Sequence, residues 1–254
     1  MSKRRRTSNN EVIQKIEEEL MNSMTENQFQ PIKRQLKINQ FKWTNTQKEF
    51  FRLALNHDAK IVFVDGPAGT SKTLLSVYCG LQLLNQKRIA DIMYLRSSVE
   101  SADQILGYLP GNADEKLAFF KIPLLEKLDE LLPETTTERL EKEGRISMFP
   151  INFTRGVNWK NKCVIVDEAQ NCTLKELTTV LTRLGEGSIC YILADPMQTD
   201  LKGGSKSGFS RMFNLFTDQE SMEQGIHTFK FTEEDIMRSE LVKYLVKKLK
   251  HIND

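Results

Sequence analysis

The sequence predicts an α/β fold in which a parallel β-sheet carries helices on both faces. Two observations indicate this fold: short apolar strands alternate with helical segments, and the first strand runs into a glycine-rich loop. Strands that are apolar at consecutive positions are typical of a parallel sheet that is covered on both faces. The expected strands span 61–64, 92–95, 146–149, 163–166 and 189–193, and an alternating run over 227–231 adds a last strand.

Capping patterns mark where helices begin between these strands. Thr46, or alternatively Thr44, is followed three residues later by Glu or Gln, which predicts a helix before the first strand. Thr173 and Thr232 show the same type of spacing and predict a helix running to residue 184 and a C-terminal helix. Further helices are expected over 72–84, 115–132 and 134–143, with a break at Pro123.

Length and composition indicate one sizeable domain with an appendage. The chain has 254 residues, which is enough for one α/β domain. Residues 1–40 combine a basic arm (residues 3–6), a short amphipathic helix (Val12, Ile16, Leu20) and a polar connector. We therefore expect an N-terminal arm over 1–40 and a single core domain over 41–254.

Charge, hydropathy and cysteine usage exclude several classes of protein. The net charge of +2 gives no global attraction for nucleic acid, so any such binding must rest on local basic clusters. No apolar run approaches the roughly 20 residues of a membrane span, and no secretory signal is present, so we expect a cytoplasmic protein. The four cysteines form no C-x-x-C pair and are predicted to be buried apolar residues.

The loop after the first strand is a candidate phosphate-binding loop. In a P-loop, backbone N–H groups and the dipole of the following helix hold phosphate oxygens. A lysine then reaches the β and γ phosphates, and the next hydroxyl binds magnesium. Lys72 and Thr73 fit these two roles. The predicted ATP-binding loop comprises Gly66, Pro67, Ala68, Gly69, Thr70, Ser71, Lys72 and Thr73.

Ser71 departs from the P-loop consensus, which has glycine at this position. If its backbone φ angle is negative, serine costs little and its N–H still donates. If φ is positive, the conformation costs about 1–2 kcal/mol and phosphate binding could suffer. Taken alone, the loop could also be an ordinary glycine-rich turn; the strand before it and the helix after it favour the P-loop.

Polar residues follow two of the later strands. Asp167 and Glu168 end the strand over 163–166, where ligands of parallel sheets bind. We expect Asp167 to hold magnesium, through water, and Glu168 to polarise the attacking water as general base. Asp195 and Gln198 follow the next strand, and Gln198 is a candidate to contact the γ-phosphate or the water; alternatively, Asp195 simply begins a Pro196 turn.

These segments together resemble the PhoH-like family, the ATPases associated with phosphate starvation. The similarity extends over residues 44–242, and the chain's short length is similar to that of phage-encoded members. The family's core is similar to one RecA-type lobe of a superfamily 1 helicase. The matching motifs, in order, occupy residues 45–47, 66–73, 106–111, 155–156, 164–171, 181–185, 195–200 and 235–239.

The resemblance assigns further roles. It implies that Gln47 reads the adenine edge and that Arg183 and Arg238 are candidates to contact the γ-phosphate, one of them in a neighbouring subunit. The chain holds one lobe where a helicase uses two, so the resemblance implies a homo-oligomer, with a hexamer favoured. Besides Ser71, the departures are Ala194, where Gly-Asp is typical, and Asn158, where Thr is usual; they concern local turns.

The leading hypothesis is an ATP- and Mg²⁺-dependent ATPase coupled to single-stranded nucleic acid. Such a protein could also be a helicase or translocase. The candidate nucleic-acid contacts are Arg155, Trp159, Lys160, Lys202 and Lys206. Trp159 could stack on a base or could be structural. The alternative is an ATP-dependent assembly switch that hydrolyses slowly and binds partner proteins. A small-molecule kinase is less favoured, because Glu168 beside Asp167 suits water as the nucleophile.

Overall fold

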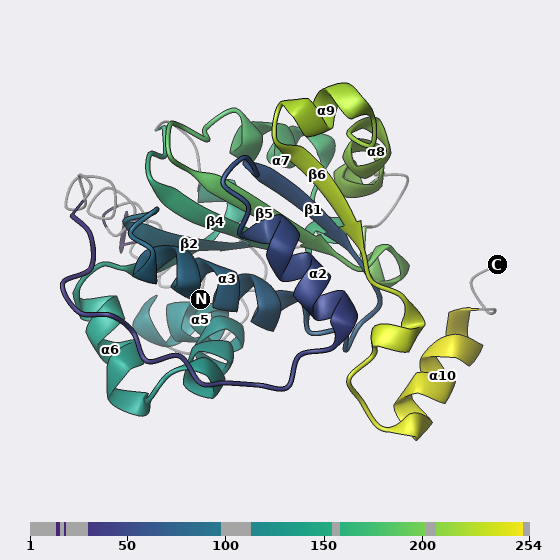
Figure 1. The fold of residues 1–254 in the computed structure, drawn as a ribbon, viewed down its shortest axis with the longest axis horizontal. Coiled ribbons are helices and arrows are strands. Elements are labelled where there is room, and N and C mark those ends of the chain that lie inside the picture. The colour runs from purple at the N-terminus through teal and green to yellow at the C-terminus, as the bar shows by residue number, and fades with distance from the viewer. Residues whose placement is uncertain are drawn as a thin grey trace, which may run out of the picture.

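The computed structural model describes residues 30–97, 113–153, 158–201 and 207–250, together with helical positions 14, 15 and 18. Within these residues a six-stranded parallel sheet forms the centre of the molecule, with strand order β3-β2-β4-β5-β1-β6 (Figure 1). The basic arm, the predicted N-terminal positions Val12, Ile16 and Leu20, and the motif at 106–111 lie outside the described residues.

All six predicted strands are present, each within one residue of its expected bounds. Because every strand is parallel to its neighbours, all their carboxyl ends lie at one edge of the sheet. The strands are β1 (Ile61–Asp65), β2 (Asp91–Arg96), β3 (Ile146–Pro150), β4 (Lys162–Asp167), β5 (Ile189–Ala194) and β6 (Ile226–Lys230).

The side chains of the central strands alternate between two separate hydrophobic cores. In β1, Val62 and Val64 belong to one core and Phe63 to the other. Burial on both sides explains why these strands have no polar face, and it confirms the predicted covered sheet.

Helices cover both faces (Figure 1). Buried side chains of α2, α3, α5 and α6 complete one core, and those of α7 and α8 complete the other. The α-helices are α2 (Asn45–Ala54), α3 (Lys72–Asn85), α5 (Ala113–Leu131), α6 (Glu134–Lys142), α7 (Leu174–Leu181), α8 (Gly208–Leu215), α9 (Gln219–Glu223) and α10 (Glu240–Lys250). The 3₁₀ turns are η1 (Ile151–Phe153), η2 (Ala169–Asn171), η3 (Pro196–Gln198) and η4 (Glu233–Asp235).

The capping predictions are confirmed in part. Thr44, not Thr46, caps α2, and Thr173 caps α7, each with a complete capping box. Thr232 caps only the 3₁₀ turn η4, so the C-terminal helix begins later than predicted, at Glu240. The predicted break at Pro123 is also wrong: α5 continues through it, because proline removes only one helical hydrogen bond and Leu124 and Leu128 are buried.

Residues 30–40 are packed onto the domain, although the sequence suggested a polar connector there. Ile32, Leu36 and Ile38 are buried in the same core as α3. The backbone of Leu36 exchanges two hydrogen bonds with the side chain of Asn85 at the end of α3. This segment therefore belongs structurally with the core domain.

All four cysteines are free and buried, as predicted. Within the part of the chain that the structure describes, no helix combines the length and the apolar character that a membrane span needs.

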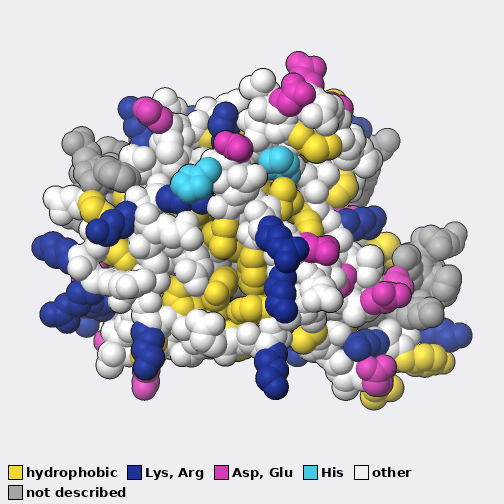
Figure 2. Space-filling model, in the orientation of Figure 1, with side chains coloured by type: hydrophobic (Ala, Val, Ile, Leu, Met, Phe, Trp, Pro, Cys, Tyr) yellow, Lys and Arg dark blue, Asp and Glu magenta, His cyan; other side chains and the backbone are white. Residues whose placement is uncertain are grey.

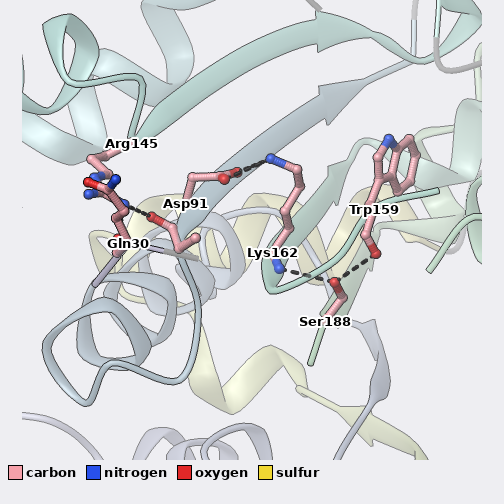
Figure 3. Close-up of polar contacts among 7 residues, drawn as sticks. Gln30, Asp91, Arg145, Trp159, Lys162 and Ser188 are labelled. Carbon is pink, nitrogen blue, oxygen red and sulfur yellow. Dashed lines mark hydrogen bonds and ion pairs between the residues drawn. The ribbon is translucent and has the colours of Figure 1, made fainter. Parts of the chain in front are cut away.

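A buried ion pair joins the amino ends of β2 and β4. Asp91 and Lys162 are directly paired in the strand register, and the Lys162 Nζ lies 2.7 Å from both carboxylate oxygens (Figure 3). Burial raises the pKa of Asp91 to about 6, and the Lys162 ammonium opposes that rise. The nearby Arg145 donates to the carbonyls of Gln30 and Ala90, which connects the N-terminal segment to this corner.

We predict that Lys162→Met destabilises the fold by about 3–5 kcal/mol, because it leaves a carboxylate buried without its partner. The double variant Asp91→Leu/Lys162→Met should recover most of that loss, since it removes both charges. Urea unfolding of the three proteins measures both effects. Equal destabilisation in the single and double variants would contradict the pairing.

Candidate nucleotide-binding site

A cavity of about 500 Å³ opens at the carboxyl edge of the sheet. The glycine-rich loop between β1 and α3, the ends of β4 and β5, the start of α2 and the segment after η4 all contribute to it. Its lining includes most of the predicted site: Gln47, Ala68, Gly69, Ser71, Lys72, Thr73, Asp167, Glu168, Gln198 and Arg238.

Close packing around the loop explains its glycines. A Cβ at Gly66 would lie 2.7 Å from the Cβ of Phe231, so no side chain fits there without movement. Gly69 has a φ of +86°, and its carbonyl accepts a hydrogen bond from the Met237 N–H. The loop is therefore held against the segment that follows β6.

Ser71 adopts a left-handed backbone conformation, with φ 65° and ψ 22°. Of the two possibilities left open by the sequence, the strained one is therefore correct. Serine at this angle costs about 1–2 kcal/mol relative to its relaxed conformation. Glycine, the consensus residue at this position, adopts a positive φ readily, so the loop here has a backbone conformation that the consensus residue would allow without strain.

Lys72 begins α3 and points back across the loop. Its Nζ donates to the carbonyls of Gly66 at 2.6 Å and Pro67 at 3.0 Å. Burial lowers the pKa of Lys72, and the negative charges of Asp195 and Asp167 are the largest effects opposing that shift. The ammonium thus lies beside the loop amides, close to where phosphate oxygens of a bound nucleotide would lie in a P-loop.

Asp167 meets the start of α3 directly. One of its carboxylate oxygens accepts hydrogen bonds from the Thr73 hydroxyl at 3.0 Å and from the Tyr94 hydroxyl at 2.6 Å. The other oxygen accepts from the backbone N–H of Glu168. The carboxylate is buried and fixed by three donors, so its orientation toward Thr73 is set before any ligand binds.

Thr73 and Asp167 form an oxygen donor set suited to Mg²⁺. This ion prefers oxygen ligands and is commonly held by one or two carboxylates together with substrate phosphates. No group of three or more His, Cys, Asp or Glu within the described residues could hold a metal alone. A bound Mg²⁺ would thus also need phosphate and water oxygens, and it would neutralise the charge of the phosphates.

Glu168 occupies a strained position and is held by a neighbour. Its φ of 54° is left-handed, which is rare for a residue with a side chain. The buried Gln170 donates to the Glu168 carboxylate at 2.6 Å, and its amide oxygen accepts from the backbone N–H of Asp195. Gln170 also donates to the backbone carbonyl of Gln198. This amide joins the ends of β4 and β5.

Asp195 fastens the glycine-rich loop to the end of β5. One carboxylate oxygen accepts from the Ala68 N–H at 2.8 Å, and the other accepts from the Met197 N–H. The second contact is the turn expected at Pro196; the first is a direct contact with the loop that sequence reasoning did not assign.

Two aromatic side chains also line the cavity. Phe41 and Trp43 line it beside Gln47, and the two rings lie 5.0 Å apart between centroids. The Gln47 amide oxygen accepts from the Thr44 N–H in the capping box of α2. Its role in contacting adenine stays a prediction, and the flat rings beside it provide apolar surface for a base.

The two candidate arginines lie in different places. Arg238 lines the cavity, and its side chain lies next to Gly69 of the loop. Arg183 follows α7, and its backbone carbonyl accepts from Trp159, just before β4 begins. Arg183 is thus at the amino edge of the sheet, opposite the cavity, and could reach a γ-phosphate only in a neighbouring copy.

The nucleic-acid candidates are only partly described. Trp159 is fully buried in the core, so the prediction that it offers a face for base stacking is wrong. The adjacent Lys160 is exposed, at the amino edge. Arg155, Lys202 and Lys206 lie outside the described residues, so the structure does not test their predicted roles.

Comparison with known proteins agrees with this geometry. The model of the PhoH-like protein family matches residues 41–250. The chain belongs to the PhoH-like family. A PhoH-like protein of Bacillus subtilis is 35% identical over 203 residues, which is 80% of this chain and 61% of the relative. A PhoH-like protein of Synechocystis is 34% identical over 203 residues, covering 80% of this chain and 60% of the relative.

Protein PhoH of Escherichia coli K12 is 34% identical over 184 residues, which is 72% of this chain and 51% of the relative. The chain thus spans about half to three-fifths of the length of these curated relatives. PhoH-like proteins are generally ATP-binding, which agrees with the RecA-like sheet and the glycine-rich loop described above.

Three contributors to the site were not assigned from the sequence: Tyr94, Gln170 and the aromatic pair of Phe41 and Trp43. Tyr94 had a detectable signal, because a tyrosine in a continuously buried strand needs a partner for its hydroxyl. Gln170 also had a detectable signal, because it lies two residues after Glu168 and its side chain can therefore reach the carboxylate pair. The contact of Tyr94 with Asp167 and those of Gln170 with Asp195 and Gln198 depend on strand order, which the sequence did not specify.

We predict that Ser71→Gly stabilises the protein by about 1 kcal/mol, because glycine adopts a positive φ without strain. Ser210→Gly inside α8 is the matched control and should destabilise by a similar amount. Urea unfolding measures both. A loss of stability in Ser71→Gly would contradict the conclusion that the Ser71 backbone is strained.

We predict that Tyr94→Phe raises the Mg²⁺ concentration needed for half-maximal binding of an ATP analogue by about tenfold, because Asp167 loses a buried donor that orients it. Tyr191→Phe is the control: Tyr191 is equally buried and donates to the Ala54 carbonyl. Both variants should lose about 1 kcal/mol of stability, but only Tyr94→Phe should change the Mg²⁺ dependence. An unchanged Mg²⁺ titration would remove Tyr94 from the site.

Proposed function

We propose that this protein is a Mg²⁺-dependent ATPase that acts as a homo-oligomer and couples hydrolysis to single-stranded nucleic acid. One observation carries the proposal: the Thr73 hydroxyl and the Asp167 carboxylate meet at 3.0 Å, with Lys72 and Glu168 lining the same cavity. This is the set of groups that binding a nucleoside triphosphate and its metal ion requires.

Water is the proposed nucleophile. Glu168 would act as general base, oriented by Gln170, and Lys72 and Arg238 would stabilise the charge on the phosphoryl oxygens. Gln198 at the rim would contact the γ-phosphate or the attacking water. With Arg183 at the far edge of the sheet, an arginine from a neighbouring copy would complete the site, which can raise the rate by about 10³–10⁵-fold. A ring, and a hexamer in particular, is the arrangement proposed.

Coupling to nucleic acid rests on local basic residues. The exposed Lys160 supports it, while Arg155, Lys202 and Lys206 remain candidates from the sequence. Duplex unwinding is the further activity that the likeness to a helicase lobe suggests.

A second candidate function is a nucleotide-dependent assembly switch that hydrolyses slowly and engages partner proteins. The left-handed Ser71 supports it, because strain in the loop could lower turnover without removing the binding site.

Steady-state ATPase measurements with and without single-stranded RNA or DNA, at two salt concentrations, separate the two functions. Stimulation that weakens at higher salt supports the coupled ATPase, since phosphate contacts release counterions. A negligible rate that nucleic acid does not change, with ATP-dependent assembly, supports the switch.

We predict that Glu168→Gln keeps ATP binding but lowers turnover by about 10²–10⁴-fold, because the amide cannot accept a proton from water. The exposed Glu138 on α6 does not line the cavity, so Glu138→Gln is the matched control and should turn over normally. Binding of a fluorescent ATP analogue and phosphate release give the two readouts. Normal turnover in Glu168→Gln would exclude it as the base.

A further inference from the structure

The C-terminal helix α10 carries an exposed apolar face. Leu241, Tyr244 and Leu245 are 66%, 58% and 45% exposed, and their spacing of three and four residues puts them on one side of the helix. Of the ten large apolar side chains exposed within the described residues, five lie between 237 and 245. Figure 1 shows α10 extending from the body of the protein at the lower right. Such a concentration marks an interaction surface.

A second apolar surface lies where α8 meets α9. Leu215 is 63% exposed and Met222 is 45% exposed. We call this surface the α8–α9 corner; it also contains the exposed acidic residues Asp218, Glu220 and Glu223. Figure 2 shows the acidic side chains gathered at the top, over α9.

The charges of the two surfaces are opposite. Beside its apolar face α10 carries Lys243 and the exposed Lys248, whereas the α8–α9 corner is acidic. Lys243 also pairs with Glu240 within the helix, so Lys248 is the clearer contributor. Complementary charge around matching apolar centres is the arrangement found in specific protein interfaces.

The two surfaces lie at opposite edges of the sheet. The segment leading into α10 packs on Gly69 at the carboxyl edge, where the nucleotide cavity lies. The α8–α9 corner is followed by Gly225, whose carbonyl accepts from Lys60 and Ile61 at the start of β1, at the amino edge. Two surfaces so separated cannot meet within one chain without a large movement, but they can meet between copies.

We propose that α10 of one copy docks on the α8–α9 corner of the next copy. This contact rests on the proposed function, which includes a homo-oligomer, and it specifies how two copies of that oligomer meet. Such a head-to-tail contact uses two different surfaces, and it generates a ring when the rotation between copies closes. It also turns the amino edge of the neighbour, which carries Arg183, toward the nucleotide cavity of the first copy. The contact thus adds a second arginine, Arg183 of the next copy, to Arg238, which already lines the cavity of its own chain.

Cysteine cross-linking tests the contact. All four natural cysteines are buried, so a disulfide can form only at introduced positions. One full-length chain carries Leu245→Cys and another carries Met222→Cys, and the two are mixed with an ATP analogue and mild oxidant. We expect a cross-linked dimer from the mixture that is at least tenfold more abundant than with either chain alone. Leu245→Cys mixed with Ile122→Cys, a 44% exposed position on α5, is the matched control and should stay monomeric on a denaturing gel.

A mixture that cross-links no better than the control would overturn the proposal. Cross-linking between two Leu245→Cys chains would also overturn it, because it would indicate a symmetric α10–α10 contact. Nucleotide binding and phosphate release, measured on the same chains, distinguish failure of this contact from failure of the proposed function. Chains that bind and hydrolyse ATP without the specific cross-link would refute this contact and leave the proposed function intact.

Discussion

The contact between the Thr73 hydroxyl and the Asp167 carboxylate is the interaction on which the site depends. It joins the first turn of α3 to the end of β4, which lies 94 residues later in the chain. The contact can form because α3 begins, and β4 ends, at the carboxyl edge of the sheet. The parallel sheet produces this proximity: every strand delivers its last residue to the same side, and the loops after β1, β4 and β5 therefore converge.

The groups around that contact hold one another in position. Tyr94 orients Asp167, Gln170 holds Glu168, and Asp195 fixes the amide of Ala68. Ser71 and Glu168 both adopt left-handed conformations, and such strain persists only where the surrounding structure enforces it. Strained backbone and buried hydrogen bonds at one place indicate a site that is organised before its ligand arrives.

Much of the fold and part of the site were predictable from the sequence, because they depend on local patterns. Apolar runs located the six strands, and the spacing of Thr44 and Thr173 located two helix starts. The late start of α10 was not predictable, because a capping box also fits a 3₁₀ turn. The convergence of Lys72 with Asp167 was expected, whereas the contacts of Tyr94 and Gln170 depend on strand neighbours that only the folded chain specifies. Trp159 shows the converse: its basic surroundings in the sequence suggested a surface role, but its ring completes a core.

The central claim is that a triphosphate and its metal ion bind between the glycine-rich loop and Asp167. Isothermal titration of a non-hydrolysable ATP analogue with Mg²⁺ into the native chain and into Lys72→Ala tests it most directly. The exposed Lys142 on α6 supplies the control Lys142→Ala. Affinity lowered by about 100-fold or more in Lys72→Ala, with native affinity in the control, is the predicted result, equivalent to a loss of about 2.7 kcal/mol. Equal affinity in all three proteins would contradict the claim.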